Sequence, residues 1–262
     1  MEKSELQKKV ERWLTEQGYP LEMRTARTFK RRGWFLHHSR RYRDPNLGKE
    51  REIDVLAFHD DPSKTSKIHG HFVVECKWTP EKPWVLFTSE LQSQTPFGHL
   101  MSTPMTESAR RSVERLLPED VSNLPLFSDI KEGYAIVQAF RKEAAIDAAY
   151  SAVQAAIGAA DFFARSMSNK TSHSILYIPT VVLDGELFRC TLEEGAEVSL
   201  QQSDIECLIY DLAENPTMSA TCVHIVRESV LNKFIDLAEI SFSSLRAALK
   251  QRRLKNETSQ EN

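Results

Sequence analysis

Acidic residues and a lysine interrupt two apolar segments of this 262-residue chain. Glu75 and Lys77 follow the apolar run 72–74, and Asp54 interrupts the apolar segment 53–58. An acid-x-lysine pair is expected by chance about two times in this composition, and the second example, 129–131, lies in a polar segment. Context therefore distinguishes the first pair. Because side chains alternate along a strand, Glu75 and Lys77 should share one face of a sheet.

Two buried acids need a reason to be buried. A carboxylate removed from water without a partner is costly, and two close together are worse unless a cation joins them. An ion pair between Lys77 and one acid is the structural explanation, but it leaves the other acid unexplained. A divalent metal accounts for both Asp54 and Glu75, with Glu22 as a third candidate. Mg²⁺ prefers oxygen ligands and commonly takes one or two carboxylates together with water and phosphate oxygens.

The elements that must position these groups follow from hydrophobic periodicity. A first helix is expected over 4–17, where Ser4 and Gln7 match a capping box, and a second over 20–33, with a proline in its first turn. Glu22 lies four residues before the apolar Ala26 and should face the same way. Strands are expected over 34–43, 52–59 and 71–78, joined as an antiparallel meander.

The rest of the chain predicts one α/β domain over 1–255, a core of 18–78 and 134–250 and a frayed tail, 256–262. Segment 79–133 holds six of the 11 prolines and is interpreted as an insertion or lid with one helix, 106–117. The other expected elements are a strand 134–140, an alanine-rich helix 142–165, a hairpin of 175–183 and 187–191 that turns at Asp184-Gly185, strands 207–212 and 222–226, and a last helix 230–252.

The order of these features resembles the PD-(D/E)xK nuclease superfamily, which has the restriction-endonuclease-like fold. The glutamate on a helix just before the first strand is most similar to the branch that holds Holliday-junction resolvases and methylation-directed type IV restriction enzymes. The resemblance covers 18–78 well and 134–183 more loosely. It departs from the family where Ile53-Asp54 replaces Pro-Asp, and where 55 residues, 79–133, separate the lysine strand from the next core segment.

The resemblance implies a central mixed sheet flanked by helices, and it implies a role for each candidate. Asp54 and Glu75 would ligate Mg²⁺ or Mn²⁺, and Glu22 would assist through water or a second ion. Lys77 would position the attacking water and offset charge that grows on the phosphate. Gln154 matches a glutamine that the related branch often has on this helix, although an exposed helix position explains it equally well.

Basic residues gather beside this candidate site. Segment 21–43 contains eight lysines and arginines and one acid, Glu22. Such residues neutralise nucleic-acid phosphates largely without regard to sequence. The alternative is a solvated helix face that acids balance elsewhere. The candidate nucleic-acid-binding residues are Arg24, Arg27, Arg31, Arg40, Arg41 and Arg43.

Composition excludes several classes of protein. The hydrophobic fraction of 41% and charged fraction of 27% are ordinary for a globular chain, and a net charge of -3 excludes a uniformly polyanion-binding surface. The sequence has no leader-like or membrane-spanning segment, so a cytoplasmic protein without a membrane partner is expected. The four cysteines form no CxxC pair and are expected to be reduced. The chain also lacks GxGxxG, Walker, GxSxG and HExxH motifs.

The sequence thus predicts a metal-dependent nuclease, an endonuclease that hydrolyses DNA phosphodiester bonds. Cleavage of both strands by such a site usually requires two copies, so a homodimer is expected if the substrate is duplex. The first alternative is a module of the same fold that binds nucleic acid or another partner without cutting. The second is a protein in which the acids and Lys77 form only a buried ion-pair network.

Overall fold

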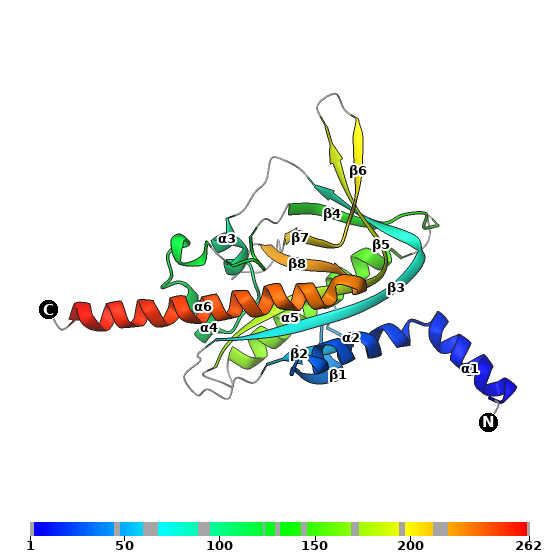
Figure 1. The fold of residues 1–262 in the computed structure, drawn as a ribbon, viewed down its shortest axis with the longest axis horizontal. Helices are drawn as coiled ribbons and strands as arrows, with labels where there is room; N and C mark the ends of the chain where they lie inside the picture. The colour runs from blue at the N-terminus through cyan, green and yellow to red at the C-terminus, as the bar shows by residue number, and fades with distance from the viewer. Residues whose placement is uncertain are drawn as a thin grey trace.

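A computed structural model describes most of the chain. The described residues are 3–44, 48–59, 68–88, 95–122, 124–128, 132–142, 146–168, 173–193, 197–211 and 220–260. Within them the chain forms eight strands and six α-helices (Figure 1). The strands are β1 (Phe35–Arg43), β2 (Glu50–Phe58), β3 (Ile68–Thr88), β4 (Glu132–Gln138), β5 (Ser174–Leu192), β6 (Val198–Ser203), β7 (Ile205–Asp211) and β8 (Ala220–Arg227). The helices are α1 (Glu5–Glu16), α2 (Tyr19–Arg31), α3 (Pro96–Met101), α4 (Glu107–Val113), α5 (Ala148–Ser168) and α6 (Leu231–Gln260).

The first two helices and the first three strands form in the order that the hydrophobic pattern predicts. The Ser4 hydroxyl accepts a hydrogen bond from the Gln7 N–H at 3.1 Å and begins α1. Gly33, at φ +84, lies just after α2, where few other residues tolerate a left-handed conformation. Strands β1, β2 and β3 then pair antiparallel in sequence order, which confirms the expected meander.

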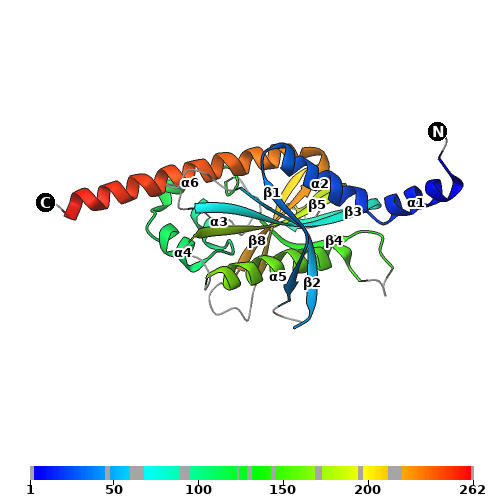
Figure 2. The ribbon, with the colours of Figure 1, turned by 90° about the horizontal axis from the view of Figure 1, so that it is seen from below.

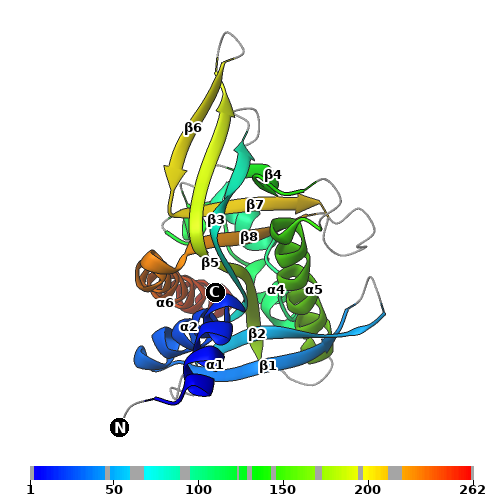
Figure 3. The same ribbon diagram turned by 90° about the vertical axis from the view of Figure 1, so that its right-hand side faces the viewer.

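The eight strands form one mixed sheet, in the order β1-β2-β3-β4-β7-β8-β5-β6. Strands β3 and β5 are long, and they also pair with each other in parallel. The pairings β3–β4, β4–β7, β7–β8, β8–β5 and β5–β3 therefore form a closed ring of strands. The β5–β6 hairpin extends beyond this ring, as Figure 3 shows.

The hairpin predicted at Asp184-Gly185 is wrong. Both residues lie inside the single continuous strand β5. Gly185 has another purpose there, because a Cβ at this position would lie 2.6 Å from the Thr79 carbonyl oxygen of β3. The glycine thus permits a close approach of two backbones, which a sequence pattern cannot distinguish from a turn.

Helices cover both faces of the sheet (Figure 2). On one face α2 and α6 bury a core that includes Phe29, Phe72 and Phe234. On the other face α5 buries alanines and Phe163 against the sheet. Side chains of β3 alternate between these two cores, with Val74 facing α2 and Val73 facing α5. The structure is therefore α/β, with the mixed sheet between helical layers.

The segment interpreted as an insertion or lid is integrated with the sheet. Residues 79–88 continue β3, and β4 then pairs with this extension. Leu100 of α3 and Val113 of α4 are fully buried in the core shared with α2 and α6. At the other end of the chain α6 continues to Gln260, beyond the expected end at residue 252. None of the described helices combines the length and apolar character that a membrane crossing requires.

Two cysteines correct the expectation that all four are reduced. Cys207 of β7 and Cys222 of β8 are joined by a disulfide, whereas Cys76 and Cys190 are free. The antiparallel pairing of β7 and β8 places the Cα atoms of the bonded pair 6.2 Å apart, within the range that a disulfide bridges. Sequence spacing alone does not reveal this pairing.

Candidate functional site

The predicted acids meet where β2 and β3 stop pairing. The ladder between these strands runs from Phe58 opposite His71 to Val55 opposite Val74, and it ends immediately before Asp54 and Glu75. Beyond the end of the ladder, the Asp54 side chain replaces a backbone carbonyl as hydrogen-bond acceptor. Its Oδ2 accepts a hydrogen bond from the Cys76 N–H at 2.7 Å. The end of the ladder thus leaves room for side chains between the two strands.

Glu75 and Lys77 share one face of β3, as alternation predicts. Lys77 Nζ donates to Glu75 Oε1 at 2.6 Å. The second oxygen, Glu75 Oε2, is buried and has no hydrogen-bond partner among the described residues. Buried polar atoms are nearly always paired in proteins, so an unpaired carboxylate oxygen demands an explanation. A bound cation is one such explanation, because it would compensate the negative charge of the carboxylate.

Glu22 lies on α2, which covers the sheet face opposite to the one that Glu75 and Lys77 share with α5, and its charge interacts with Asp54 and Lys77. Its neighbour Leu21 is buried against the sheet, and Glu22 itself is half-buried. Burial, and then the negative charge of Asp54, raise the pKa of Glu22, while Lys77 lowers it. Charges on α2, β2 and β3 therefore act on one another through Glu22, Asp54 and Lys77.

The pKa values of both carboxyls and of the lysine are raised, so the charged form is disfavoured at Asp54 and Glu75 and favoured at Lys77. Burial raises the pKa of Glu75 to about 7, against the opposing effect of Lys77. Burial also raises the pKa of Asp54, although the Cys76 N–H and Lys77 favour its charged form. Burial works against charged Lys77, but attraction to Glu75 and Asp54 outweighs this and raises its pKa. Lys77 is therefore protonated, whereas the acids would gain from a further positive charge.

The side chain of Gln154 lies in α5, on the face of the sheet that Glu75 shares. Its amide Nε2 is buried, and no hydrogen-bond partner for it lies in the part of the chain that the structure describes. The next residue, Ala155, accepts a hydrogen bond from the Tyr42 hydroxyl at 3.2 Å, and the charge of Glu75 acts on Tyr42. The Gln154 Nε2 donor and the Glu75 Oε2 acceptor, for both of which the described residues provide no partner, thus lie on the same side of the sheet. Burial of Gln154 Nε2 contradicts the alternative that Gln154 is simply an exposed helix residue.

The carboxylates are not preassembled as a tight group of three. Among the described residues, the group of three His, Cys, Asp or Glu side chains whose ligand atoms all lie within 4.8 Å is Cys207, Cys222 and His224. Oxygens of Glu22, Asp54 and Glu75 do not all meet that distance. The ion pair with Lys77 and the bond to the Cys76 N–H hold two of the carboxylates instead.

The candidate nucleic-acid-binding arginines divide into two groups. Arg24 is held by two carboxylates, with 2.7 Å to Asp184 and 2.6 Å to Glu228. The others lie on α2 and along β1 with exposed side chains, and Arg41 among them pairs with Glu52 at 3.3 Å. The exposed members are Arg27, Arg31, Arg40, Arg41 and Arg43.

Sequence reasoning missed Arg51. Its charge lowers the pKa of Glu75, and its guanidinium lies 3.3 Å from the buried Asp44. Arg51 precedes the apolar part of β2, and its position relative to Glu75 depends on how β2 diverges from β3.

Sequence reasoning also missed the group formed by Cys207, Cys222 and His224. Strand alternation places Cys222 and His224 on one face, and this was the available signal.

Comparison with protein-family models, with curated proteins and with solved structures gives no match for this chain.

Proposed function

We propose that this chain is a metal-dependent phosphodiesterase, and more specifically a DNA endonuclease with a restriction-endonuclease-like core of the PD-(D/E)xK type. The observation that carries the proposal is the buried, unpaired Oε2 of Glu75 beside Asp54 and protonated Lys77. The order α2, β1, β2, β3, α5 and β5, with helices on both sheet faces, supports the same resemblance.

The donor set fits Mg²⁺ or Mn²⁺. Asp54 and Glu75 offer only oxygen atoms, which hard divalent cations prefer. Mg²⁺ retains several waters, so two carboxylates suffice and Glu22 can contribute through water. The two acids already lie at the end of one ladder, and binding requires Glu75 to share its charge between Lys77 and the cation.

Each residue then has a defined task in phosphodiester hydrolysis. A divalent cation held by Asp54 and Glu75 would supply positive charge and lower the pKa of a bound water. Lys77, protonated and 2.6 Å from Glu75, donates hydrogen bonds that orient the attacking water and stabilise negative charge on the phosphate. Glu22 orients a second water, and Gln154 Nε2 donates to Glu75 or to the phosphate. The exposed arginines of α2 and β1 hold the DNA backbone.

The partners follow from this chemistry. A homodimer would bring two such sites to opposite strands of a duplex. We propose that the protein acts in the cytoplasm.

Cleavage of supercoiled plasmid tests the proposal. Wild-type protein should nick the plasmid with Mg²⁺ or Mn²⁺ and not with EDTA. Lys77→Ala should lower the rate at least about 100-fold, because it removes charge stabilisation at the phosphate. The matched control is Lys82→Ala, an exposed lysine of the same strand, which should cut like wild type. Equal rates for Lys77→Ala and wild type, or cutting in EDTA, would contradict catalysis by this site.

A non-cutting module is the second candidate. The hydrogen bond between Lys77 and Glu75 favours it, since this pair partly satisfies both groups without a metal. Such a module would bind DNA in a salt-dependent manner, and Asp54→Asn would leave binding unchanged.

A third possibility is that Asp54, Glu75 and Lys77 form only an ion-pair network. In that case Mg²⁺ will not raise the melting temperature of the protein, whereas Mg²⁺ that binds to the folded state must raise it.

A further inference from the structure

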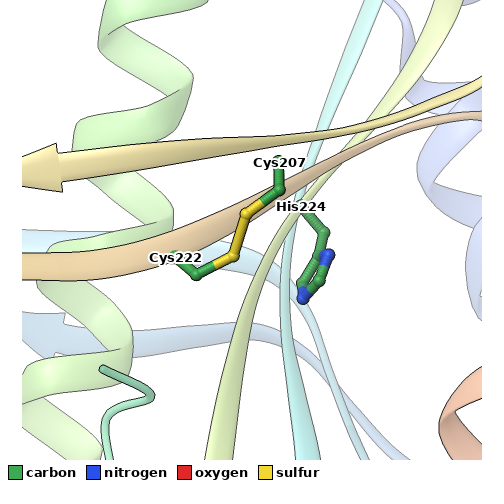
Figure 4. A group of neighbouring side chains, drawn as sticks. All are labelled: Cys207, Cys222 and His224. Atoms are coloured by element: carbon green, nitrogen blue, oxygen red, sulfur yellow. A yellow bond between two sulfur atoms is a disulfide. The ribbon is translucent and has the colours of Figure 1, made fainter. Parts of the chain in front are cut away.

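A second cluster of chemically active side chains lies on the strands β7 and β8, away from the carboxylates. Cys207 lies directly opposite His224 in the antiparallel register, and Cys222 precedes His224 by two residues on the same face of β8. All three residues are buried. Their sulfur and ring nitrogen atoms lie within 4.8 Å of one another. Figure 4 shows the His224 ring beside the bonded sulfurs of Cys207 and Cys222.

This cluster opens onto a cavity between the sheet and α6. The cavity has a volume of about 190 Å³, and Cys207 and His224 contribute to its lining. Phe234 and Lys233 of α6 lie on its opposite side, and the Phe234 ring centroid is 5.2 Å from that of His224. A water molecule occupies about 30 Å³, so the cavity has space for an additional ligand beside the two strands.

We propose that, when both cysteines are reduced, Cys207, Cys222 and His224 bind one Zn²⁺ ion, with a fourth coordination position that faces this cavity. Thiolate and imidazole ligands suit Zn²⁺ and not Mg²⁺. Tetrahedral Zn²⁺ with Zn–S of about 2.3 Å and Zn–N of about 2.0 Å needs ligand atoms about 3.5 to 3.8 Å apart. Three ligand atoms within 4.8 Å reach that geometry by small side-chain rotations.

Charge balance favours a metal at this buried place. Two thiolates and one neutral imidazole give the protein ligands a charge of two negative units, which Zn²⁺ cancels. A neutral site avoids the large cost of uncompensated charge in a protein interior. The nearby Glu206 is already paired, since its carboxylate lies 2.8 Å from Arg189.

The disulfide and the metal site exclude each other because they use the same two sulfurs. A dithiol reductant transfers two electrons and two protons to the Cys207–Cys222 bond, and the reductant itself becomes a disulfide. Zn²⁺ then displaces two protons from the thiols to solvent and accepts a lone pair from His224. The bonded pair in the structure is therefore the oxidised, metal-free form of the site.

Cobalt and zinc titrations of the full chain test this assignment. The protein is reduced, freed of reductant under anaerobic conditions and titrated with Co²⁺. One equivalent should produce thiolate-to-cobalt charge-transfer bands, which Zn²⁺ abolishes by displacement. Competition with a chromophoric chelator gives the Zn²⁺ affinity. Cys222→Ser and His224→Gln should each weaken it at least about 100-fold, the upper end of the loss seen for outer-shell partners.

Controls separate this site from other thiols and from the carboxylate site. Cys190→Ser, at a free half-buried cysteine, and Lys77→Ala should leave Zn²⁺ affinity within about twofold of wild type. Because a buried substitution can prevent folding, alkylation of the wild type provides a second measurement: Zn²⁺ should slow modification of Cys207 and Cys222 and leave Cys76 and Cys190 unchanged. Absence of the cobalt bands in reduced wild type, or their persistence in folded Cys222→Ser, would refute the site.

Discussion

The two carboxylate oxygens of Glu75 lie in different surroundings. Oε1 accepts a hydrogen bond from Lys77 Nζ at 2.6 Å, whereas Oε2 is buried and accepts none from the described residues. Burial raises the pKa of this carboxyl to about 7, although Lys77 opposes the shift. Burial therefore favours the protonated form of this carboxyl more than water does. Protons and a divalent cation would compete for it around this pKa.

Glu75→Gln should change how stability depends on pH. In wild type the folded pKa of about 7 exceeds the ordinary value of 4.5. The folded state therefore binds more protons between these values, and the free energy of unfolding falls as pH rises from about 4.5 to 7. Glutamine does not titrate, so Glu75→Gln should gain up to about 3 kcal/mol relative to wild type between pH 5 and pH 8. Urea denaturation in EDTA measures this difference.

The difference between variants is the required measurement because other buried groups act oppositely. Burial lowers the pKa of His71 and of His224 to about 3, so these two residues make stability rise with pH toward 6.5. The matched control is Glu81→Gln, an exposed acid of the same strand, which should follow the wild-type pH profile. A constant difference between Glu75→Gln and wild type would show that Glu75 has an ordinary pKa.

At the scale of elements, β1 presents arginines beside the proposed site. Arg40, Arg41 and Arg43 are exposed near the end of β1 where β2 leaves β3. The helix α4 lies beside the start of β5, because its capping Thr106 accepts a hydrogen bond from the Ile175 N–H at 3.0 Å. The two elements therefore offer basic residues at different places along the sheet.

Replacement of Arg40, Arg41 and Arg43 by glutamine should weaken DNA binding and reduce its salt dependence. The slope of log K against log salt should fall by about 1 for each phosphate contact that is lost. The control with equal charge change replaces Arg110, Arg111 and Arg115, in and just after α4. Fluorescence anisotropy with duplex DNA between low and moderate salt measures both effects. Equal slopes for the two triple variants would place DNA binding elsewhere.

At the scale of the whole molecule, Phe72 of β3 packs against residues from both the N-terminal and the C-terminal parts of the chain. Its ring centroid lies 5.1 Å from those of Phe29 and Trp34, and 5.6 Å from that of Phe234 in α6. Arg32, which follows α2, also pairs with Glu239 of α6 at 2.7 Å. The first core strands, α2 and the last helix are therefore parts of a single packed face.

Phe72→Ala should lower the free energy of unfolding by about 3 to 5 kcal/mol, because it leaves a cavity among close-packed rings. One cooperative transition should remain, at lower denaturant concentration. Phe140→Ala, at a side chain that is 83% exposed, is the control and should change stability by less than about 0.5 kcal/mol. Loss of less than about 1 kcal/mol in Phe72→Ala would mean that α2 and α6 are stabilised independently of this strand.

The sequence by itself determined the local features of this protein. Alternation and helical periodicity depend on nearest neighbours, so they correctly placed Glu75 with Lys77, Asp54 in the adjoining strand and α2 before the meander. They also predicted the α/β class. These features are encoded within a few residues, and tertiary contacts only lengthen or shorten the elements that contain them.

Only the tertiary structure decided which distant groups meet. Gly185 looks like a turn residue until Thr79 of β3 is seen against it. Cys207 and Cys222 look like separate core thiols until β7 pairs with β8. The unpaired oxygen of Glu75 depends on burial by several elements at once. Register and burial are properties of strands brought together from far along the chain, and no local pattern contains them.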